Sequence, residues 1–309
     1  MTKKVLILSD GKAGHENQSR ALARALGCDF SLVEIHFRSP FHKALSYLLD
    51  HLRVRTLSLF EPCCPKCLGL DGATRYDAVL GTGSGVFYAV KTLAKKLAVP
   101  SAVVLYPRGY DLASFDCILA PSFDNPKAAG NVVSLPANLV ANDAAFYAAG
   151  VDAYRARTDV VPEIAVVIGG PNACATMEKP WMQARLDEIF ALTGRKAVTT
   201  SRRTPPDVEA LVDSYPWDYK LIYSKEKFNP IPAFVSLAKT LFVTAESTGM
   251  ISEACTFGSS CVRVLDNLKP GPSKFRRFIE TLRKDGCLDG SRKIDFAPSF
   301  ERARSLLRL

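Results

Sequence analysis

The chain has 309 residues, of which 48% are hydrophobic and 23% are charged, a composition that excludes wholesale disorder. Its 40 Lys and Arg against 31 Asp and Glu give a net charge of +9 without a basic tail, which fits an anionic small molecule or an anionic membrane surface as well as nucleic acid. No apolar run approaches the ~20 residues that cross a bilayer, and the apolar run near the N-terminus is too short for a secretory signal, so we expect a cytoplasmic protein.

The first half of the chain alternates short apolar strands with helices. Strands are expected at 5–9, 31–36, 77–81, 102–106 and 115–120, and helices at 17–26, at 41–55 and in the segment that ends at residue 97. This alternation predicts βαβ units and a parallel sheet.

The same pattern restarts after a helical segment at 151–157. Strands are expected at 164–168, 196–200, 220–223, 240–244 and 260–265, with helices at 180–193, 206–214, 232–238 and 247–257. Because a domain commonly has ~100–200 residues, we predict two doubly wound, Rossmann-like α/β domains, 1–157 and 158–309, facing a cleft.

Loops that follow strands are the candidate sites, because open parallel sheets bind ligands beyond the carboxyl ends of their strands. The first such loop is the polar run at 9–18, in which glycines let the backbone turn tightly. His15 and Glu16 are its titratable side chains and could hold a general base against an acceptor hydroxyl. The alternative is a polar turn that only caps a helix. A second run, Gly-Thr-Gly-Ser-Gly at 81–85, lacks the spacing of a phosphate-binding loop and could simply permit close helix–sheet packing.

Two loops in the second half suit a phosphate group. Gly169 and Gly170 follow an apolar strand, and their N–H groups could hold a diphosphate or form a ligand-free turn. Arg202 and Arg203, flanked by hydroxyls, suit phosphate or carboxylate, or form a solvated basic turn.

A third loop leads from a strand into a helix. Ser247 and Thr248 are cap residues for that helix. Glu253, further along the helix, could reach the ribose of a nucleotide, or lie on a solvated face. Glu246 is either part of the site or a structural carboxylate.

Cysteine usage argues against a disulfide framework. Nine cysteines are scattered along a chain large enough to bury a core, and in a reducing cytosol most should be small buried hydrophobes. Cys63, Cys64 and Cys67 form a local cluster, but a structural zinc needs further ligands and no second pair exists. We expect no metal.

The segment at 41–55 reads as an amphipathic helix with basic residues. Two interpretations stay open: the apolar stripe rests on an anionic inner leaflet, or it packs on the sheet. The stripe comprises Phe41, Ala44, Leu45, Leu48, Leu49 and Leu52, with Lys43, Arg53 and Arg55 in or just after it.

Taken together, these motifs resemble one family. They are residues 9–18 (Ser-Asp-Gly-Lys-Ala-Gly-His-Glu-Asn-Gln), 106–108, 115–126, 130–132, 168–171 (Ile-Gly-Gly-Pro), 200–205, 229–230 and 243–254 (Val-Thr-Ala-Glu-Ser-Thr-Gly-Met-Ile-Ser-Glu-Ala). The family is that of the bacterial relatives of the plant mitochondrial-fission factor whose loss elongates mitochondria, regarded as glycosyltransferases of GT-B type. This chain has Glu246 where the family often has Asp, and Ser-Thr-Gly at 247–249 where it often has Ser-Val.

The resemblance implies a GT-B fold whose N-terminal domain binds the acceptor and whose C-terminal domain binds a nucleoside-diphosphate sugar without a metal. It favours His15 as the base, with Glu16 beside it, and an acceptor hydroxyl on a cell-envelope saccharide or a lipid-linked molecule. Nucleic acid is not an expected partner, and no cofactor is expected. The residues assigned to the donor are Gly14, Gly169, Gly170, Pro171, Ser201, Arg202, Arg203, Thr204, Glu246, Ser247, Thr248, Met250 and Glu253.

Two other functions remain open at this point. A binding protein or adaptor could keep the fold and lack the chemistry, and a nucleotide-sugar epimerase would act on the donor alone. Fold analogy does not decide among them.

Overall fold

The structure is a computed structural model that describes residues 2–72 and 74–309 and divides into two compact units. Unit 1 comprises the chain up to Ala141 together with Asp295–Leu309, and unit 2 comprises Asn142–Ile294. These boundaries differ from the predicted domains 1–157 and 158–309, and two helices account for the difference.

The first of these helices is α4 (Ala144–Arg155), which belongs to unit 2. Its Tyr154 is fully buried and packs edge-on against Tyr219 and Phe234, with ring centroids 4.8 and 5.9 Å away.

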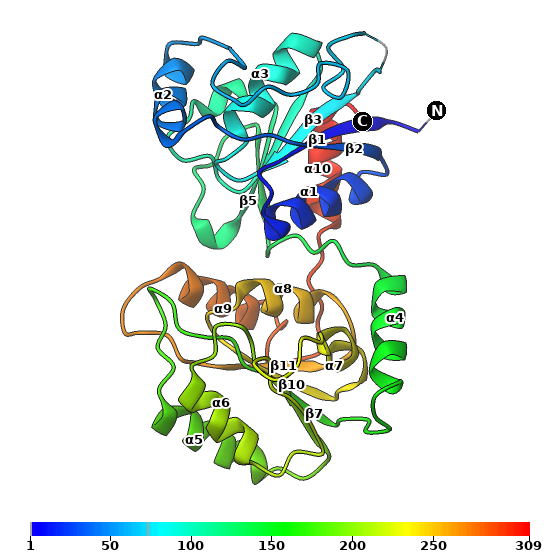
Figure 1. Ribbon diagram of the computed structural model, residues 1–309, viewed down its shortest axis with the longest axis vertical. Coiled ribbons are helices and arrows are strands. Elements are labelled where there is room, and N and C mark those ends of the chain that lie inside the picture. The colour runs from blue at the N-terminus through cyan, green and yellow to red at the C-terminus, as the bar shows by residue number, and fades with distance from the viewer. Residues whose placement is uncertain (1, 73) are drawn as a thin grey trace. The chain divides into compact units, whose positions relative to one another are not determined.

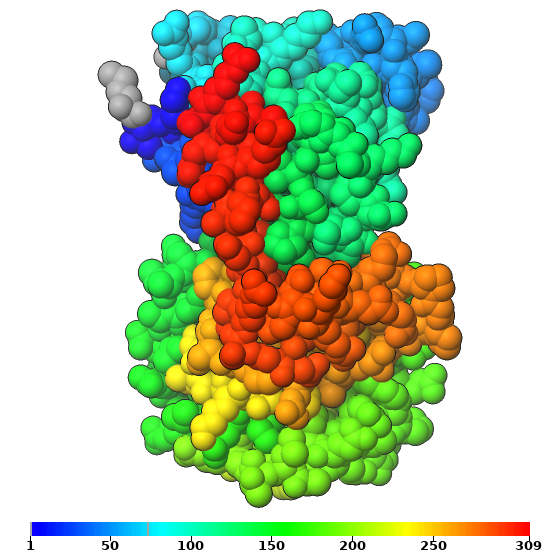
Figure 2. Space-filling view, turned by 180° about the vertical axis from the view of Figure 1, so that it is seen from behind, coloured from blue at the N-terminus to red at the C-terminus, as the bar shows by residue number. Residues whose placement is uncertain are grey.

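The second is α10 (Ala297–Leu307), the last helix of the chain, which returns to unit 1. It buries Ala303 and Leu307, and Arg302 donates a hydrogen bond to the carbonyl of Gly130. Figure 2 shows this helix in red lying along unit 1. Element order alone does not reveal which sheet such a terminal helix covers.

Unit 1 is built on a six-stranded parallel sheet in the order β2-β1-β3-β4-β5-β6. Figure 1 labels β1, β2, β3 and β5 of this sheet. The central strands are buried along their whole length, which explains why they read as continuous apolar runs. The strands are β1 (Lys4–Ser9), β2 (Asp29–Glu34), β3 (Ala78–Thr82), β4 (Ser101–Val104), β5 (Cys117–Pro121) and β6 (Val132–Leu135), and the helices besides α10 are α1 (Ala13–Ala25), α2 (Pro40–His51) and α3 (Phe87–Leu97), with short 3-10 turns at Leu112–Ser114 and Ser122–Asp124.

Unit 2 has a five-stranded parallel sheet in the order β11-β10-β7-β8-β9. The predicted fold class, two Rossmann-like parallel sheets, is confirmed. The strands are β7 (Ile164–Val167), β8 (Lys196–Thr199), β9 (Tyr219–Leu221), β10 (Thr240–Thr244) and β11 (Cys261–Leu265), and the helices besides α4 are α5 (Lys179–Phe190), α6 (Pro206–Ser214), α7 (Ile231–Leu237), α8 (Thr248–Thr256) and α9 (Lys274–Lys284).

Sequence reasoning missed β6, α9 and α10 and started α1 too late. The helix α1 begins at Ala13 after an extended Lys12, not at residue 17, so His15 and Glu16 lie in its first turn. No helix among residues 2–72 and 74–309 is long and apolar enough to cross a membrane.

Candidate functional site

A histidine–aspartate pair lies where β1 passes into α1. The Nδ1 atom of His15 is 3.0 and 3.1 Å from the two carboxylate oxygens of Asp10. Lys12 Nζ lies 3.0 Å from the same carboxylate, whose side chain is only 6% exposed. Burial acts to raise the pKa of Asp10, but hydrogen bonds from Lys12 and His15 outweigh it and the net pKa is lowered. The second ring nitrogen of His15, Nε2, has no hydrogen bond to any described residue, so it is the open end of the pair.

The glycine run at 81–85 makes room for this pair. A Cβ atom on Gly83, whose φ is +87°, would lie 2.3 Å from the His15 ring, and one on Gly85 would lie 2.7 Å from Asp10. A Cβ on Gly81 would collide with two valine side chains of the following helix. The run therefore permits close packing, and the packed group is the histidine–aspartate pair.

Glu16, the other predicted catalytic residue, is held within its own helix. Arg20 donates two hydrogen bonds to Glu16 Oε1, at 2.9 and 2.8 Å, and Ser9 Oγ lies 3.3 Å from Oε2. The neighbouring Gly14 faces open space, since an added Cβ would meet nothing within 4 Å.

The Gly-Gly turn after β7 has its N–H groups already engaged. Gly169 donates to Thr244 Oγ1 at 2.9 Å, and Gly170 donates to Glu246 Oε1 at 2.8 Å. The prediction that these two N–H groups hold a diphosphate is therefore contradicted. Pro171 follows directly and has no N–H to offer.

Glu246 ties together three strand ends of unit 2. Its side chain is fully buried. Its Oε1 atom accepts from Gly170 and Thr244, its Oε2 atom accepts from Asn267 Nδ2 at 2.9 Å, and Arg203 approaches to 3.9 Å. With every oxygen engaged, the carboxylate fits the structural alternative.

The loop after β8 has one buried and two exposed side chains. Thr204 Oγ1 donates to the carbonyl of Gly169 at 2.6 Å and accepts from the N–H of Ser201 at 2.9 Å, so it locks this loop to the Gly-Gly turn. Arg202 and Arg203 are exposed. Arg202 has no hydrogen bond or ion pair in the described part of the chain, which leaves its guanidinium available to an anion.

The start of α8 carries N–H groups, those of Gly249 and Met250, that have no acceptor within the helix. Ser247 precedes the helix without capping it through its side chain, and Thr248, Gly249 and Met250 form the first turn. The N–H groups of a first turn have no acceptor within the helix. Gly249 faces open space.

Glu253 lies one turn further along α8, and only one of its two carboxylate oxygens has a hydrogen-bond partner among the described residues. Its Oε1 atom accepts hydrogen bonds from Asn142 Nδ2 at 3.0 Å and Tyr147 Oη at 2.9 Å. Burial raises the pKa of this carboxyl group, and those two hydrogen bonds oppose the rise. Its Oε2 atom has no partner among the described residues. Burial and the two hydrogen bonds to Oε1 show that Glu253 does not lie on a solvated face.

Sequence reasoning missed the partners of these residues. The sequence pattern does not indicate Asp10 as the orienting partner of His15. Thr244, Asn267 and Tyr147 carried no signal, because each meets its partner only through the fold.

The packing of the Gly-Gly turn after β7 can be tested by substitution. We expect Gly170→Ala to destabilise the protein by about 1–3 kcal/mol, since the added Cβ would lie 2.1 Å from the backbone carbonyl oxygen of Arg203. Gly249→Ala in α8 is the matched control, because its Cβ enters open space and a helical alanine is favoured. Urea denaturation of both variants gives the comparison, and equal stability of the two would contradict the packing.

The cysteine cluster forms no metal centre in the structure. No group of three or more His, Cys, Asp or Glu side chains within residues 2–72 and 74–309 could hold a metal ion. Cys63, Cys64 and Cys67 are free thiols, and hydrogen bonds from the backbone and thiol of Cys67 lower the pKa of Cys64.

Comparison with known proteins agrees with this architecture. A family model described as mitochondrial fission ELM1 matches residues 13–294. Among solved structures, UGT89C1 of Arabidopsis thaliana complexed with UDP has a TM-score of 0.54 and 11% identity, covering 99% of this chain and 90% of that one. UDP-GlcNAc 2-epimerase from Neisseria meningitidis bound to UDP-GlcNAc has a TM-score of 0.53 and 13% identity, covering 99% and 100%.

A third structure, the glycosyltransferase SnogD from Streptomyces nogalater, has a TM-score of 0.50 and 13% identity, covering 100% of this chain and 95% of that one. At these identities the likeness shows the fold, which is of GT-B type. No curated protein matches the chain in sequence.

Proposed function

The chain belongs to the mitochondrial fission ELM1 family, and from that premise we propose that it is a metal-independent glycosyltransferase. It would move a sugar from a nucleoside-diphosphate donor to a hydroxyl of a cell-envelope saccharide or lipid-linked acceptor. The observation that carries the proposal is the His15–Asp10 pair at the carboxyl end of β1, with an open Nε2 atom.

In this mechanism His15 is the general base. Asp10 accepts a hydrogen bond from Nδ1–H, which leaves the lone pair on Nε2 and stabilises the imidazolium that forms. Nε2 takes the proton of the acceptor hydroxyl as its oxygen bonds to the anomeric carbon of the sugar. The bond from that carbon to the diphosphate oxygen breaks, and the diphosphate leaves with the electron pair.

Unit 2 would bind the donor. The N–H groups of Gly249 and Met250 in the first turn of α8 and the guanidinium of Arg202 are the groups that suit the diphosphate. The unpartnered Oε2 of Glu253 suits a ribose hydroxyl. The remaining predicted donor residues, including Glu246 and Thr204, would shape this site through the contacts described above.

Nucleotide binding is the first test. Thermal unfolding with UDP, GDP, ADP and CMP should show stabilisation by at least one nucleotide, about 2.7 kcal/mol at one hundred times its Kd. Glu253→Gln should weaken that nucleotide roughly 10–100-fold, because a hydrogen bond to a charged group is lost. Glu188→Gln, on the exposed face of α5, is the control. No stabilisation by any nucleotide would favour the adaptor function, and donor turnover without an acceptor would favour an epimerase.

We also propose that the protein is cytoplasmic and that unit 1 makes peripheral contact with the inner membrane. The helix α2 supports this, because part of its apolar stripe is exposed.

A further inference from the structure

The helix α2 turns much of its apolar surface outward. Phe41, Leu48 and Leu52 are 71%, 58% and 62% exposed, whereas Ser46 and Asp50 on the opposite face are fully buried. The alternative that the whole stripe packs on the sheet is therefore contradicted for these three side chains. The helix lies at the margin of unit 1 in Figure 1.

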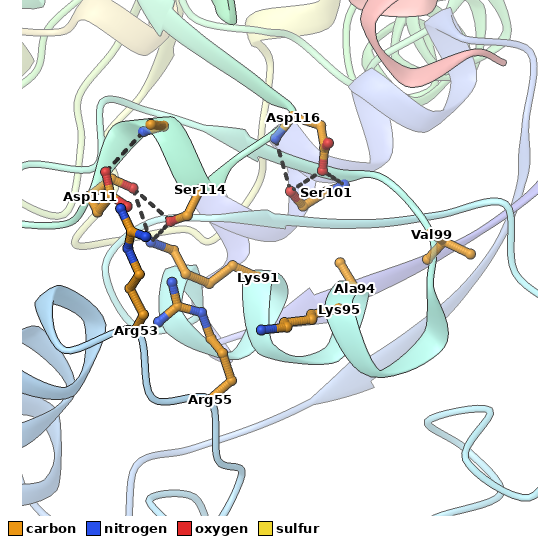
Figure 3. A pocket seen from close by; sticks show the side chains of 11 residues that line it. Arg53, Arg55, Lys91, Ala94, Lys95, Val99, Ser101, Asp111, Ser114 and Asp116 are labelled. Atoms are coloured by element: carbon orange, nitrogen blue, oxygen red, sulfur yellow. Dashed lines mark hydrogen bonds between the residues drawn. The ribbon is translucent and has the colours of Figure 1, made fainter.

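A cationic cavity begins where this helix ends (Figure 3). Its volume is about 390 Å³, and Arg53, Arg55, Lys91 and Lys95 line it. Arg53 directly follows Leu52, and its φ of +57° turns the chain back so that Arg55 also reaches the cavity. The exposed apolar surface and the cavity are thus continuous along the chain.

Two of these four cations share a single buried carboxylate as their partner. Lys91 Nζ lies 2.7 Å from the buried Asp50 carboxylate and Arg55 lies 3.2 Å from it. The side chains of Arg53 and Lys95 have no hydrogen bond or ion pair to any residue that the structure describes. These two side chains therefore have no direct carboxylate partner in the cavity.

The carboxylates that line the cavity are engaged locally. Asp116 accepts hydrogen bonds from the N–H and hydroxyl of Ser101, both at 2.8 Å. Asp111 accepts from the N–H of Ala113 at 3.2 Å. Neither is paired with Arg53 or Lys95, so an external anion meets a cavity with free cationic donors.

We propose that this cavity binds the phosphate of an anionic phospholipid headgroup while the exposed side chains of α2 lie among the adjoining acyl chains. The occupant follows from charge and position. Between residues 36 and 60 the only acidic residue is the buried Asp50, so the exposed surface there repels no anionic lipid. The proposal builds on the membrane contact proposed above and is independent of the transferase chemistry.

A soluble lipid tests the cavity without a bilayer. Dihexanoylphosphatidylglycerol below its micellar concentration should bind the full chain, and dihexanoylphosphatidylcholine should not. Arg53→Asn, in which Asn tolerates the positive φ, and Lys95→Gln should each weaken binding roughly tenfold or more. The matched control is Lys96→Gln, on the same helix but outside the cavity, which should change affinity by less than about twofold. Equal losses for Lys95→Gln and Lys96→Gln would overturn the proposal in favour of diffuse charge attraction.

Vesicles then test the apolar half of the proposal. Phosphatidylcholine vesicles that contain phosphatidylglycerol should sediment the protein at low salt, and pure phosphatidylcholine vesicles should not. Leu48→Ser with Leu52→Ser should abolish sedimentation and leave cavity binding of glycerol 3-phosphate intact. Binding of glycerol 3-phosphate by a protein that never binds vesicles would overturn the lipid assignment and point to a soluble phosphate. Nucleotide-induced stabilisation should be unchanged in all these variants, which separates failure here from failure of the transferase proposal.

Discussion

His15→Ala should lower turnover about 10²–10⁴-fold and leave nucleotide affinity nearly unchanged, because it removes the proposed general base and no proposed donor contact. Release of nucleoside diphosphate from the donor sugar, with acceptor present, measures the first quantity. Thermal shift with the nucleotide measures the second. Full turnover in His15→Ala would place the base elsewhere.

Asp10→Asn should reduce turnover almost as far, because the amide no longer holds the Nδ1–H tautomer or stabilises the imidazolium. The natural control is Glu16→Gln in the same helical turn. Its amide can keep the contacts to Ser9 and one to Arg20, so we expect turnover within a few-fold of the original protein. A severe defect in Glu16→Gln with a mild one in Asp10→Asn would exchange the roles of the two carboxylates.

The candidate catalytic segment can be predicted from the sequence because strand and glycine signals are local. His15 lies in the polar run that follows an apolar strand, and that placement singles it out among four histidines. Its partner depends on where α1 begins. With the helix starting at Ala13, the ring turns back over Asp10, which a start at residue 17 does not predict.

The sequence predicts the candidate donor-side residues from their loops, but it does not predict their contacts. Gly170 and Glu246 are 76 positions apart, and nothing in either local pattern indicates that one donates to the other. The sequence does not show that such an N–H group has an acceptor. In the fold, parallel strands bring their carboxyl ends together, and the N–H group donates to a carboxylate that is distant in sequence. The same limit explains α10, whose apolar face does not say which sheet it covers.

The hydrophobic periodicity of α2 also does not predict that the polar face of this helix is the buried one. Apolar residues at helical spacing predict an apolar buried face, but here Asp50 is fully buried because it meets partners from two other segments. Lys91 Nζ contacts it at 2.7 Å, and the N–H of Asp111 donates to it at 2.7 Å. This pairing leaves the leucines of α2 outside.

Asp50→Leu should destabilise the protein by about 3–5 kcal/mol, because it leaves Lys91, Arg55 and the Asp111 N–H without their shared acceptor. Lys91→Met should cost less, since Arg55 still compensates the carboxylate. The double variant should lose less than the sum of the two single losses, as a double-mutant cycle in urea would measure. Additive losses would mean that the pair is not coupled.

The pH dependence of stability tests the Asp50–Lys91 pair through the titration of the lysine. Burial lowers the pKa of Lys91 to about 8 from 10.5, although Asp50 opposes the shift. Between these two pH values the unfolded chain therefore binds more protons at this position than the folded protein does. The free energy of unfolding should therefore increase as the pH rises across that window. The increase should be larger than in Lys91→Met, which lacks the titrating lysine. Parallel stability curves for the two proteins from pH 8 to 10.5 would show that Lys91 keeps an ordinary pKa, and that Asp50 attraction fully offsets its burial.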